Sequence, residues 1–297
     1  MHVLITGGSG LIGTHLSRKL NEKGYETAVL SRKKQSDPDI KTYLWDPGKN
    51  EIEEGAIEKA GYIVHLAGAN ISDKRWTKKR KQEIVDSRVE TAKLLFDKVS
   101  ESKTRPKAFI SASAVNYYGT LTSDKIFSED DPPSAGFLGE TCKKWEQAAG
   151  RFSDVGVRTV IVRTGVVISP GGGALKKMAL PVKLGLGAPI GSGKQYFPWI
   201  HVDDLCGIYI KAIEDSKMQG AYNGVAPDHI TNRDVMKALA DAFNRPFWAP
   251  RVPAFAMKIL FGEMADILLK GSRISADKIK EAGYEFRLTD FKNAVSL

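Results

Sequence analysis

The sequence predicts an α/β fold in which a doubly wound parallel sheet is followed by a smaller C-terminal lobe. Over the first 165 residues, short apolar runs alternate with segments of helical periodicity. Strands that alternate with helices are typical of βαβ units, whose parallel strands are covered by helices on both faces. After residue 165 glycine and proline become frequent, which predicts loop-rich segments outside that sheet.

Each element is predicted from its own local pattern. Apolar runs predict strands at Val3–Thr6, Thr27–Ser31, Lys41–Leu44, Tyr62–Ala67, Lys107–Ala112 and Arg158–Arg163. Apolar residues at helical spacing predict helices at Leu11–Lys23, Thr77–Ser100, Leu138–Val155, Leu205–Ile213 and Asn232–Phe243. The segment from Pro250 to Leu297 is predicted to form further helices and a small terminal unit.

Composition excludes several classes of protein. The chain has 297 residues, a net charge of +9 and two cysteines, too few for a disulfide framework or a cysteine-based zinc site. No run approaches the roughly 18 apolar residues of a membrane span, and the apolar start of the chain is too short for a signal peptide. We therefore expect no membrane association and a cytoplasmic location.

A dense group of basic residues needs a separate explanation. It precedes a segment with helical periodicity and consists of Lys74, Arg75, Lys78, Lys79, Arg80 and Lys81. The charged face of an amphipathic helix is the favoured interpretation. A nucleic-acid surface is the less favoured one, because no nucleic-acid-binding motif accompanies the group.

A glycine motif follows the first predicted strand and opens the first predicted helix. The run from Thr6 to Gly13 reads TGGSGLIG and contains Gly7, Gly10 and Gly13 at three-residue spacing. Glycines in this context permit a tight turn and let the backbone approach a pyrophosphate, which the helix N-terminus attracts. We expect a Rossmann-type dinucleotide site, with the phosphates held by Gly7, Gly10, Leu11, Ile12 and Gly13. The alternative is a sharp turn that binds nothing.

The end of the second predicted strand indicates which dinucleotide binds. An NAD-binding unit usually has an acidic residue about 20 residues after the motif, on the ribose 2′-hydroxyl. This chain has Ser31 and Arg32 there. A guanidinium suits a 2′-phosphate, whereas a carboxylate would repel it. NADP is therefore the predicted cofactor, with a solvated basic turn as the alternative.

These motifs resemble those of the extended short-chain dehydrogenase/reductase superfamily. The resemblance rests on TGGSGLIG, on HLAG at residues 65–68, on SASAV at residues 111–115 and on FPWIHVDD at residues 197–204. More narrowly, the chain is similar to the sugar-epimerase-like subfamily 39U, through SR at 31–32, RW at 75–76, SR at 87–88, GGGA at 171–174, GLG at 185–187, the run 189–204 and NGVAP at 223–227. The segment from residue 250 onward is similar to the subfamily's C-terminal domain of unknown function.

The resemblance implies an NADP-binding Rossmann domain over residues 1–165, with later segments returning to it. It further implies substrate-lobe and lid segments over residues 166–249 and a small C-terminal helical domain over residues 250–297. Within the lid, residues 171–199, the side chains of Lys194, Tyr196 and Trp199 are expected to offer charge and stacking.

The resemblance also assigns individual cofactor contacts. Ser31 and Arg32 would hold the 2′-phosphate. Leu66 and Ala67 would line the cofactor with their backbone, and Gly68 follows them as a further cofactor contact. Glu83 and Arg88 would contact the cofactor from the following helix, and Val162 would touch its nicotinamide side. From the residues alone, Glu83 and Arg88 would be interpreted as a solvated pair on one helix.

The catalytic pair of the superfamily is missing. Its members typically carry Tyr-x-x-x-Lys, in which the tyrosine handles a proton and the lysine lowers its pKa. None of the nine tyrosines has a lysine four residues later, and Leu138 and Cys142 occupy the matching positions. The substitutes considered are Ser113, which keeps a hydroxyl at a superfamily position, and Tyr117, with Tyr118 as its neighbour.

Two weaker substitutes remain open. Cys142 is a thiol candidate, although a single cysteine on an apolar helix face is usually core. His201 with Asp203 and Asp204 is an acid–base candidate. The favoured interpretation places His201 in a strand, with the two acids capping the helix that begins near Leu205 and stabilising its dipole. The five histidines show no metal-ligand spacing, so no metal is predicted.

The favoured function is therefore an NADP(H)-dependent oxidoreductase or epimerase acting on an unknown small polar substrate, with a nucleotide sugar as one candidate. The alternative is a non-catalytic NADPH-binding sensor, because Tyr-x-x-x-Lys is absent. A nucleic-acid binder is a third and weaker interpretation. The assembly is left open, with a homodimer as one candidate.

Overall fold

A computed structural model describes residues 2–34, 40–170 and 172–295, and its centre is a mostly parallel sheet with helices on both faces. Across the described residues the sheet has eight strands in the order β11-β8-β6-β5-β1-β2-β3-β4. Their bounds are β1 (His2–Thr6), β2 (Glu26–Ser31), β3 (Lys41–Asp46), β4 (Glu51–Ile52), β5 (Tyr62–His65), β6 (Ala108–Ala114), β8 (Arg158–Thr164) and β11 (Gly220–Gly224). Only the β3–β4 pairing of this sheet is antiparallel. The predicted fold class is confirmed.

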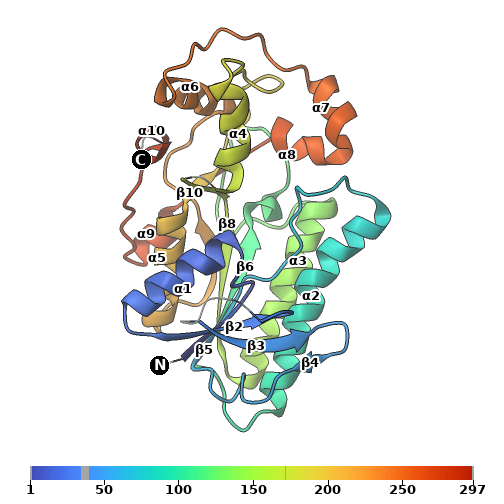
Figure 1. The fold of residues 1–297 in the computed structure, drawn as a ribbon, viewed down its shortest axis with the longest axis vertical. Coiled ribbons are helices and arrows are strands. Elements are labelled where there is room, and N and C mark those ends of the chain that lie inside the picture. The colour runs from blue at the N-terminus through green and yellow to red at the C-terminus, as the bar shows by residue number, and fades with distance from the viewer. Residues whose placement is uncertain (1, 35–39, 171, 296–297) are drawn as a thin grey trace.

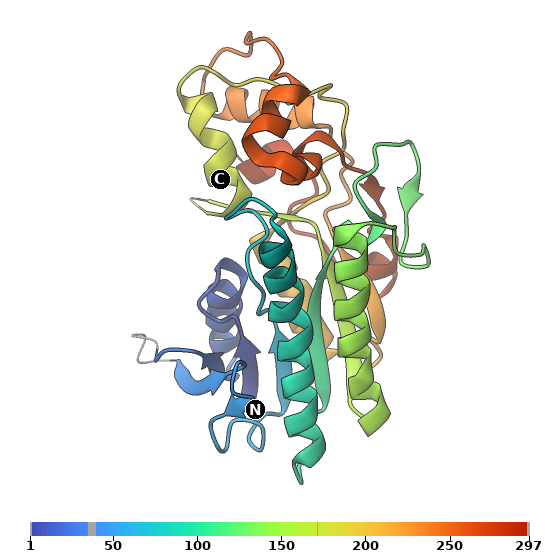
Figure 2. The ribbon, with the colours of Figure 1, turned by 90° about the vertical axis from the view of Figure 1, so that its right-hand side faces the viewer.

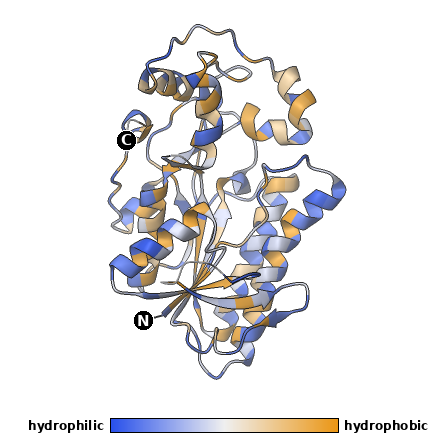
Figure 3. Ribbon diagram, viewed as in Figure 1, coloured by the Kyte–Doolittle hydropathy of each residue, from blue (hydrophilic) through white to orange (hydrophobic). Residues whose placement is uncertain are grey.

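Two pairs of long helices cover the sheet (Figures 1 and 2). The helices α1 (Leu11–Glu22) and α5 (Val202–Glu214) pack together on one face, and α2 (Lys78–Glu101) and α3 (Phe137–Gly150) on the other. Neighbouring residues of β1 serve different faces, because Ile5 lies in one buried cluster with Leu16 while Leu4 lies in another with Leu95. Side chains alternate along a strand, so a strand covered on both faces is apolar throughout. Figure 3 shows this apolar colouring on the central strands and polar colouring on the outer sides of the helices.

A smaller lobe lies beyond the carboxyl ends of the strands (Figure 1). Its helices are α4 (Gly173–Lys183), α6 (Asn232–Ala242), α7 (Ala254–Phe261) and α8 (Ala265–Leu269), with the short η3 (Gly262–Met264) between the last two. The final helices α9 (Asp277–Glu281) and α10 (Phe291–Val295) descend along the α5 side. Short parallel pairs join β9 (Val166–Ser169) to β10 (Trp199–His201) and β7 (Ile126–Phe127) to β12 (Arg273–Ile274).

Each strand and helix expected in the first 165 residues is present, with bounds shifted by a few residues. The predicted strand over Tyr62–Ala67 ends at His65, because the N–H groups of Leu66 and Ala67 turn to the Thr6 hydroxyl. Thr77 caps α2 by accepting a hydrogen bond from the Arg80 N–H, and the predicted helix over residues 138–155 becomes 3₁₀ after α3, in η2 (Arg151–Val155). Several elements were not predicted, among them the short strands β4, β7, β9 and β12, the glycine-bounded β11, and α4 within the expected lid.

Three of the six residues of the basic group before α2 make contacts within the chain. The Arg80 guanidinium is buried, donates to the Asn70 carbonyl and pairs with Glu83 at 2.8 Å. Lys81 pairs with Glu263, and the Arg75 side chain lies against Gly262. These contacts attach the η3 turn of the lobe to the start of α2. Separately, no described helix has the length and apolarity needed to cross a membrane.

Candidate cofactor and active site

The glycine turn between β1 and α1 leaves no room for side chains. Gly7 has a φ of +69°, and a Cβ there would lie 2.9 Å from the Leu66 carbonyl carbon. A Cβ on Gly13 would lie 2.4 Å from the Gly7 oxygen, which itself accepts the Gly10 N–H at 3.0 Å. Gly10 is the N-cap of α1 and provides no side-chain hydrogen bond to the first N–H groups of the helix. These N–H groups, at the positive end of the helix dipole, can therefore bind an anion. The turn fits a pyrophosphate.

The turn after β5 lies directly beside the glycine turn. The Thr6 hydroxyl accepts the N–H groups of Leu66 and Ala67, both at 3.1 Å, and reaches His65 Nδ1 at 2.8 Å. Because both acceptor positions of Thr6 are filled, its hydrogen goes to Nδ1 and His65 is a neutral ring. Burial lowers the pKa of His65 to about 4, which agrees with that assignment. These bonds fix the backbone from Leu66 to Gly68 against the glycine turn.

The structure places the remaining expected cofactor contacts in different surroundings. Arg32 is exposed at the end of β2, after the half-buried Ser31. Glu83 is exposed and pairs with Arg80, not with Arg88. Val162 is 0 % exposed in the middle of β8 and belongs to the sheet core. The contacts expected of these residues remain predictions.

Arg88 is a largely buried cation on α2. Its Nη1 donates to the carbonyls of Ala69 at 3.1 Å and Ile84 at 2.9 Å, and its guanidinium lies 5.0 Å from the Trp145 ring. A Cβ on Gly68 would lie 3.0 Å from Cζ of Arg88, so the guanidinium adjoins the turn after β5. Burial lowers the pKa of Arg88 to about 10, which leaves it charged at neutral pH. Among the described residues no carboxylate lies within ion-pair distance of it.

Ser113, at the end of β6, belongs to a polar network that the sequence did not predict. Its Oγ donates to Glu146 Oε1 of α3 at 2.7 Å. Arg163 of β8 binds the same carboxylate through Nε at 2.9 Å and Nη2 at 2.8 Å. Burial alone would lower the pKa of Arg163, but the hydrogen bonds and charge of Glu146 raise it. An arginine inside an apolar strand was the available signal, because buried charges need partners.

The two tyrosines after β6 are held by the same arginine. Arg163 donates to the Tyr118 hydroxyl at 2.9 Å, and its guanidinium lies 3.6 Å from the Tyr117 ring centre. Tyr118 in turn donates to Asn223 of β11 at 2.7 Å. Burial raises the pKa of both tyrosines despite the nearby cation. Tyr117 is therefore a packed partner of Arg163 and lies on the network rather than apart from it.

The positions that match Tyr-x-x-x-Lys are packed. Leu138 and Cys142 of α3 are 8 % and 4 % exposed. Burial and the Glu146 charge raise the pKa of Cys142 to about 12, despite the opposing effect of Arg88. Cys142 is therefore a neutral thiol at physiological pH and supplies no cation.

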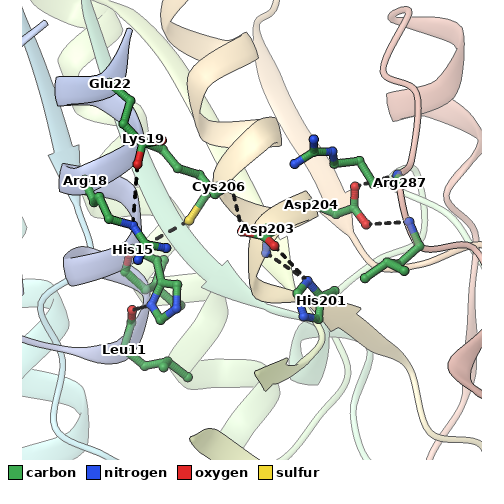
Figure 4. Close-up of polar contacts among 12 residues, drawn as sticks. Leu11, His15, Arg18, Lys19, Glu22, His201, Asp203, Asp204, Cys206 and Arg287 are labelled. Atoms are coloured by element: carbon green, nitrogen blue, oxygen red, sulfur yellow. Dashed lines mark hydrogen bonds and ion pairs between the residues drawn. The ribbon is translucent and has the colours of Figure 1, made fainter. Parts of the chain in front are cut away.

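His201 caps α5 and Asp203 links α5 to α1, as Figure 4 shows. His201 ends β10 and caps α5, its Nδ1 accepting the Asp203 N–H at 3.2 Å. Asp203 pairs with Lys19 of α1 at 2.7 Å. The expectation that the two acids cap the helix is wrong, since α5 begins at Val202 and the cap is the histidine ring. Both acids do lie in the first turn, where they favour the helix dipole, and His201 ends a strand as expected. Burial lowers the pKa of His201 even though Asp203 and Asp204 oppose this, which also favours a neutral ring.

Asp204 holds the C-terminal segment. It is 0 % exposed and accepts the Tyr284 hydroxyl at 3.0 Å and the N–H groups of Arg287 at 2.8 Å and Leu288 at 3.0 Å. A buried carboxylate with three donors is a structural anchor. Trp199, expected to offer a stacking face in the lid, is instead 0 % exposed and packs edge-on against Phe291 at 5.2 Å.

A surface hollow of about 550 Å³ lies elsewhere, at the amino ends of the first three strands. Leu4, Ala28 and Tyr43 contribute to its wall, and it contains none of the expected site residues. In the part of the chain that the structure describes, no three His, Cys, Asp or Glu side chains are grouped as metal ligands.

Comparison with known proteins identifies the class of this chain. The model of the NAD dependent epimerase/dehydratase family matches residues 3–223, and a domain of unknown function, DUF1731, matches residues 252–296. The chain therefore belongs to the NAD-dependent epimerase/dehydratase family. The resemblance inferred from its motifs is confirmed.

Individual relatives narrow the match. The chain is 37 % identical to the epimerase family protein SDR39U1 of Mus musculus, over 99 % of this chain and 98 % of the relative, and 34 % identical to the epimerase family protein YfhF of Bacillus subtilis, over 100 % and 97 %. The crystal structure of human SDR39U1 (isoform 2) with NADPH superposes with a TM-score of 0.90 at 35 % identity, covering 100 % of this chain and 98 % of that one. A UDP-glucose 4-epimerase from Thermotoga maritima shares the fold, with a TM-score of 0.81 at 19 % identity, covering 100 % and 97 %.

Proposed function

We propose that this protein is an NADP(H)-dependent oxidoreductase or epimerase that acts on a small polar substrate, with nucleotide sugars as candidates. The observation that carries the proposal is the glycine turn. Its backbone at the N-terminus of α1 can bind an anion, and Gly7 lies directly against the backbone of Leu66. NADPH in the structure of the human relative supports the choice of cofactor. The two free, buried cysteines support the reducing, cytoplasmic location proposed with it.

The chain's own residues fit the cofactor in separate parts. The proposed phosphate site is Gly7, Gly10, Leu11, Ile12 and Gly13. The exposed Arg32 with Ser31 would bind the 2′-phosphate, because a guanidinium makes strong hydrogen bonds to phosphate oxygens. The proposed contacts to the remainder are Leu66, Ala67, Gly68, Glu83, Arg88 and Val162.

The chemistry needs a group that handles a proton. When bound, NADP(H) would supply hydride while the substrate oxygen gains a proton, or accept hydride while that oxygen loses one. Neither Leu138 nor Cys142 can exchange that proton at neutral pH. We propose Ser113 for this position, because its hydroxyl stands at the carboxyl end of β6 and is connected to the Glu146 carboxylate. Tyr117 is a weaker candidate, because its ring is held against Arg163.

A second function is favoured by one specific observation. Leu138 and Cys142, which replace the Tyr and Lys of the family motif, are buried and packed. Neither position therefore offers an exposed proton donor. An NADPH-binding sensor without turnover needs no such donor. This alternative predicts tight NADPH binding with no oxidation of the cofactor by any carbonyl compound.

One experiment separates the two functions. NADPH binding is measured by the fluorescence of the nicotinamide, and NADPH oxidation is then followed with aldehydes, ketones and nucleotide sugars. The enzyme proposal requires tight binding and oxidation above the buffer rate by at least one compound. Binding without oxidation would favour the sensor, and the absence of NADPH binding would refute both.

A further inference from the structure

The smaller lobe carries most of the large apolar side chains that the fold leaves exposed. Among the described residues eleven such side chains are exposed, and eight of them lie between Leu180 and Leu268. Seven of these are 59–70 % exposed, namely Leu180, Leu184, Leu186, Trp248, Phe255, Ile259 and Leu260. We call these seven the apolar lobe surface. Exposed apolar side chains that gather on one part of a protein mark an interaction site.

Two segments that are far apart in the sequence form this surface. The first is the end of α4 with the residues just after it, and the second runs from Trp248 through α7. They meet where the Gly191 N–H donates to the Val252 carbonyl at 2.8 Å and the Val252 N–H donates to the Pro189 carbonyl at 2.9 Å. In Figure 1 the segment between α6 and α7 passes over the end of the lobe that lies away from the sheet. The surface is therefore on the outer end of the molecule.

The helix α7 has apolar residues on its outer side as well as on its inner side. Met257 is buried, whereas Phe255 and Ile259, which are one turn apart, are 67 % and 69 % exposed. A helix that faces only water normally has polar residues on its outer side. Figure 3 shows mostly apolar colouring along α7. Within the described part of the chain, nothing covers the outer side of this helix.

The charges beside the apolar lobe surface are all positive. Residues 173–200 and 243–260 contain no Asp or Glu and seven Lys or Arg, namely Lys176, Lys177, Lys183, Lys194, Arg245, Arg251 and Lys258. All seven are exposed, and none of them forms an ion pair with another described residue. A second copy of the chain would place like charges against this surface, and their repulsion disfavours that occupant. The complementary occupant is negatively charged and accepts apolar side chains.

We propose that the apolar lobe surface binds the surface of an anionic phospholipid bilayer. Its side chains stand out from the lobe instead of lining a groove, which suits insertion between lipid headgroups while the basic groups beside them contact the lipid phosphates. The Trp248 ring suits the boundary between headgroups and hydrocarbon, because it is apolar with one polar N–H.

Binding to a bilayer surface needs no helix that crosses the bilayer. The expectation of no membrane association rested on the missing span, and the exposed lobe revises it for the membrane surface. The inference goes beyond the proposed function and does not depend on it.

The test is co-sedimentation of the full-length protein with lipid vesicles. One set of vesicles contains equal parts of phosphatidylglycerol and phosphatidylcholine, and the other contains phosphatidylcholine alone. We expect at least about tenfold tighter binding to the anionic vesicles at low salt, because each Lys or Arg near an anionic surface strengthens binding by about fivefold. Added salt should weaken this binding.

Variants assign the binding to named residues. Phe255→Ala should weaken binding to the anionic vesicles by about tenfold, and Lys258→Gln by about fivefold. Leu44→Ala on β3 and Lys103→Gln after α2 are the matched controls, because they remove an exposed apolar side chain and an exposed cation outside the lobe. Both controls should bind as the unmutated protein does. A thermal melt establishes that each variant is folded, and if Phe255→Ala does not fold, Lys258→Gln decides.

Brominated lipids test which part of the protein enters the bilayer. Of the five tryptophans Trp248 is the exposed one, so bromine on the acyl chains should quench part of the fluorescence, and Trp248→Phe should remove that quenching. No binding to the anionic vesicles, or equal binding to the neutral ones, would overturn the inference. So would undiminished binding of the folded Phe255→Ala or Lys258→Gln protein, or quenching that persists in Trp248→Phe.

Discussion

Replacing Gly13 with alanine should weaken NADPH binding strongly while the protein still folds. The added Cβ would lie 2.4 Å from the Gly7 oxygen and 2.6 Å from Gly8 Cα, both backbone atoms that cannot rotate away. Ordinary contact begins near 3.4 Å, so the turn must open by about 1 Å, which stretches hydrogen bonds to a phosphate beyond their useful range. Losing one or two charge-assisted bonds corresponds to NADPH binding weaker by about 10²-fold, or about 2.7 kcal/mol.

The assay is an NADPH titration by fluorescence, with a urea unfolding curve for each variant. Overpacking should cost Gly13→Ala about 1–3 kcal/mol of stability. Gly150→Ala is the matched control, because a Cβ there has no atom within 4 Å and its φ is −61°. It should bind NADPH normally and gain up to about 1 kcal/mol. A folded Gly13→Ala protein with a dissociation constant within about twofold of the unmutated one would refute the placement of the pyrophosphate at this turn.

Three other perturbations test the cofactor, the C-terminal anchor and the buried histidine. Arg32→Asp should reverse a preference of at least about tenfold for NADPH over NADH, since a carboxylate repels the 2′-phosphate; equal dissociation constants in the unmutated protein would contradict this. Asp204→Asn places an amide donor against a buried N–H donor and should lower the free energy of unfolding in urea by about 3 kcal/mol. Asp203→Asn, at a side chain that is one third exposed, should lower it by less than about 1 kcal/mol, and equal losses would contradict the anchoring role of Asp204. The depressed pKa of His65, about 4, keeps the folded ring neutral, so stability should fall by about 1.4 kcal/mol per pH unit as the pH drops from about 6.5 towards 4, and His65→Gln should remove that part of the slope.

Local patterns in the sequence were enough to predict the inner strands of the sheet, from β8 to β3, and the glycine turn. A strand buried on both faces needs a continuous apolar run, and a turn that admits no Cβ needs glycine, so both can be inferred from neighbouring residues alone. The same holds for Thr77, whose hydroxyl caps the helix that begins beside it. The family resemblance rested on these local motifs and on others of the same kind.

Two of the elements that were not predicted, β11 and α4, lack such patterns. The strand β11 is a short run with glycine at each end, and it becomes a strand because β8 offers a free edge. The helix α4 lies among glycines and contains Pro181, features that predict loop. Pairing with β8 decided the conformation of β11, and packing against β9 and α6 decided that of α4, since tertiary contacts override weak local propensities.

By itself, the sequence determined the fold class, the position of the dinucleotide motif and the absence of Tyr-x-x-x-Lys. Only the tertiary structure decided which side chains meet at the end of β6. Ser113 and Glu146 are 33 residues apart in the chain, and Arg163 lies a further 17 residues on. The Glu146 carboxylate nevertheless binds both Ser113 and Arg163. No local pattern encodes that meeting, because the partners of a buried charge are set by the order of strands and the packing of helices upon them. Whether a serine donates or accepts a hydrogen bond is therefore a property of the folded chain.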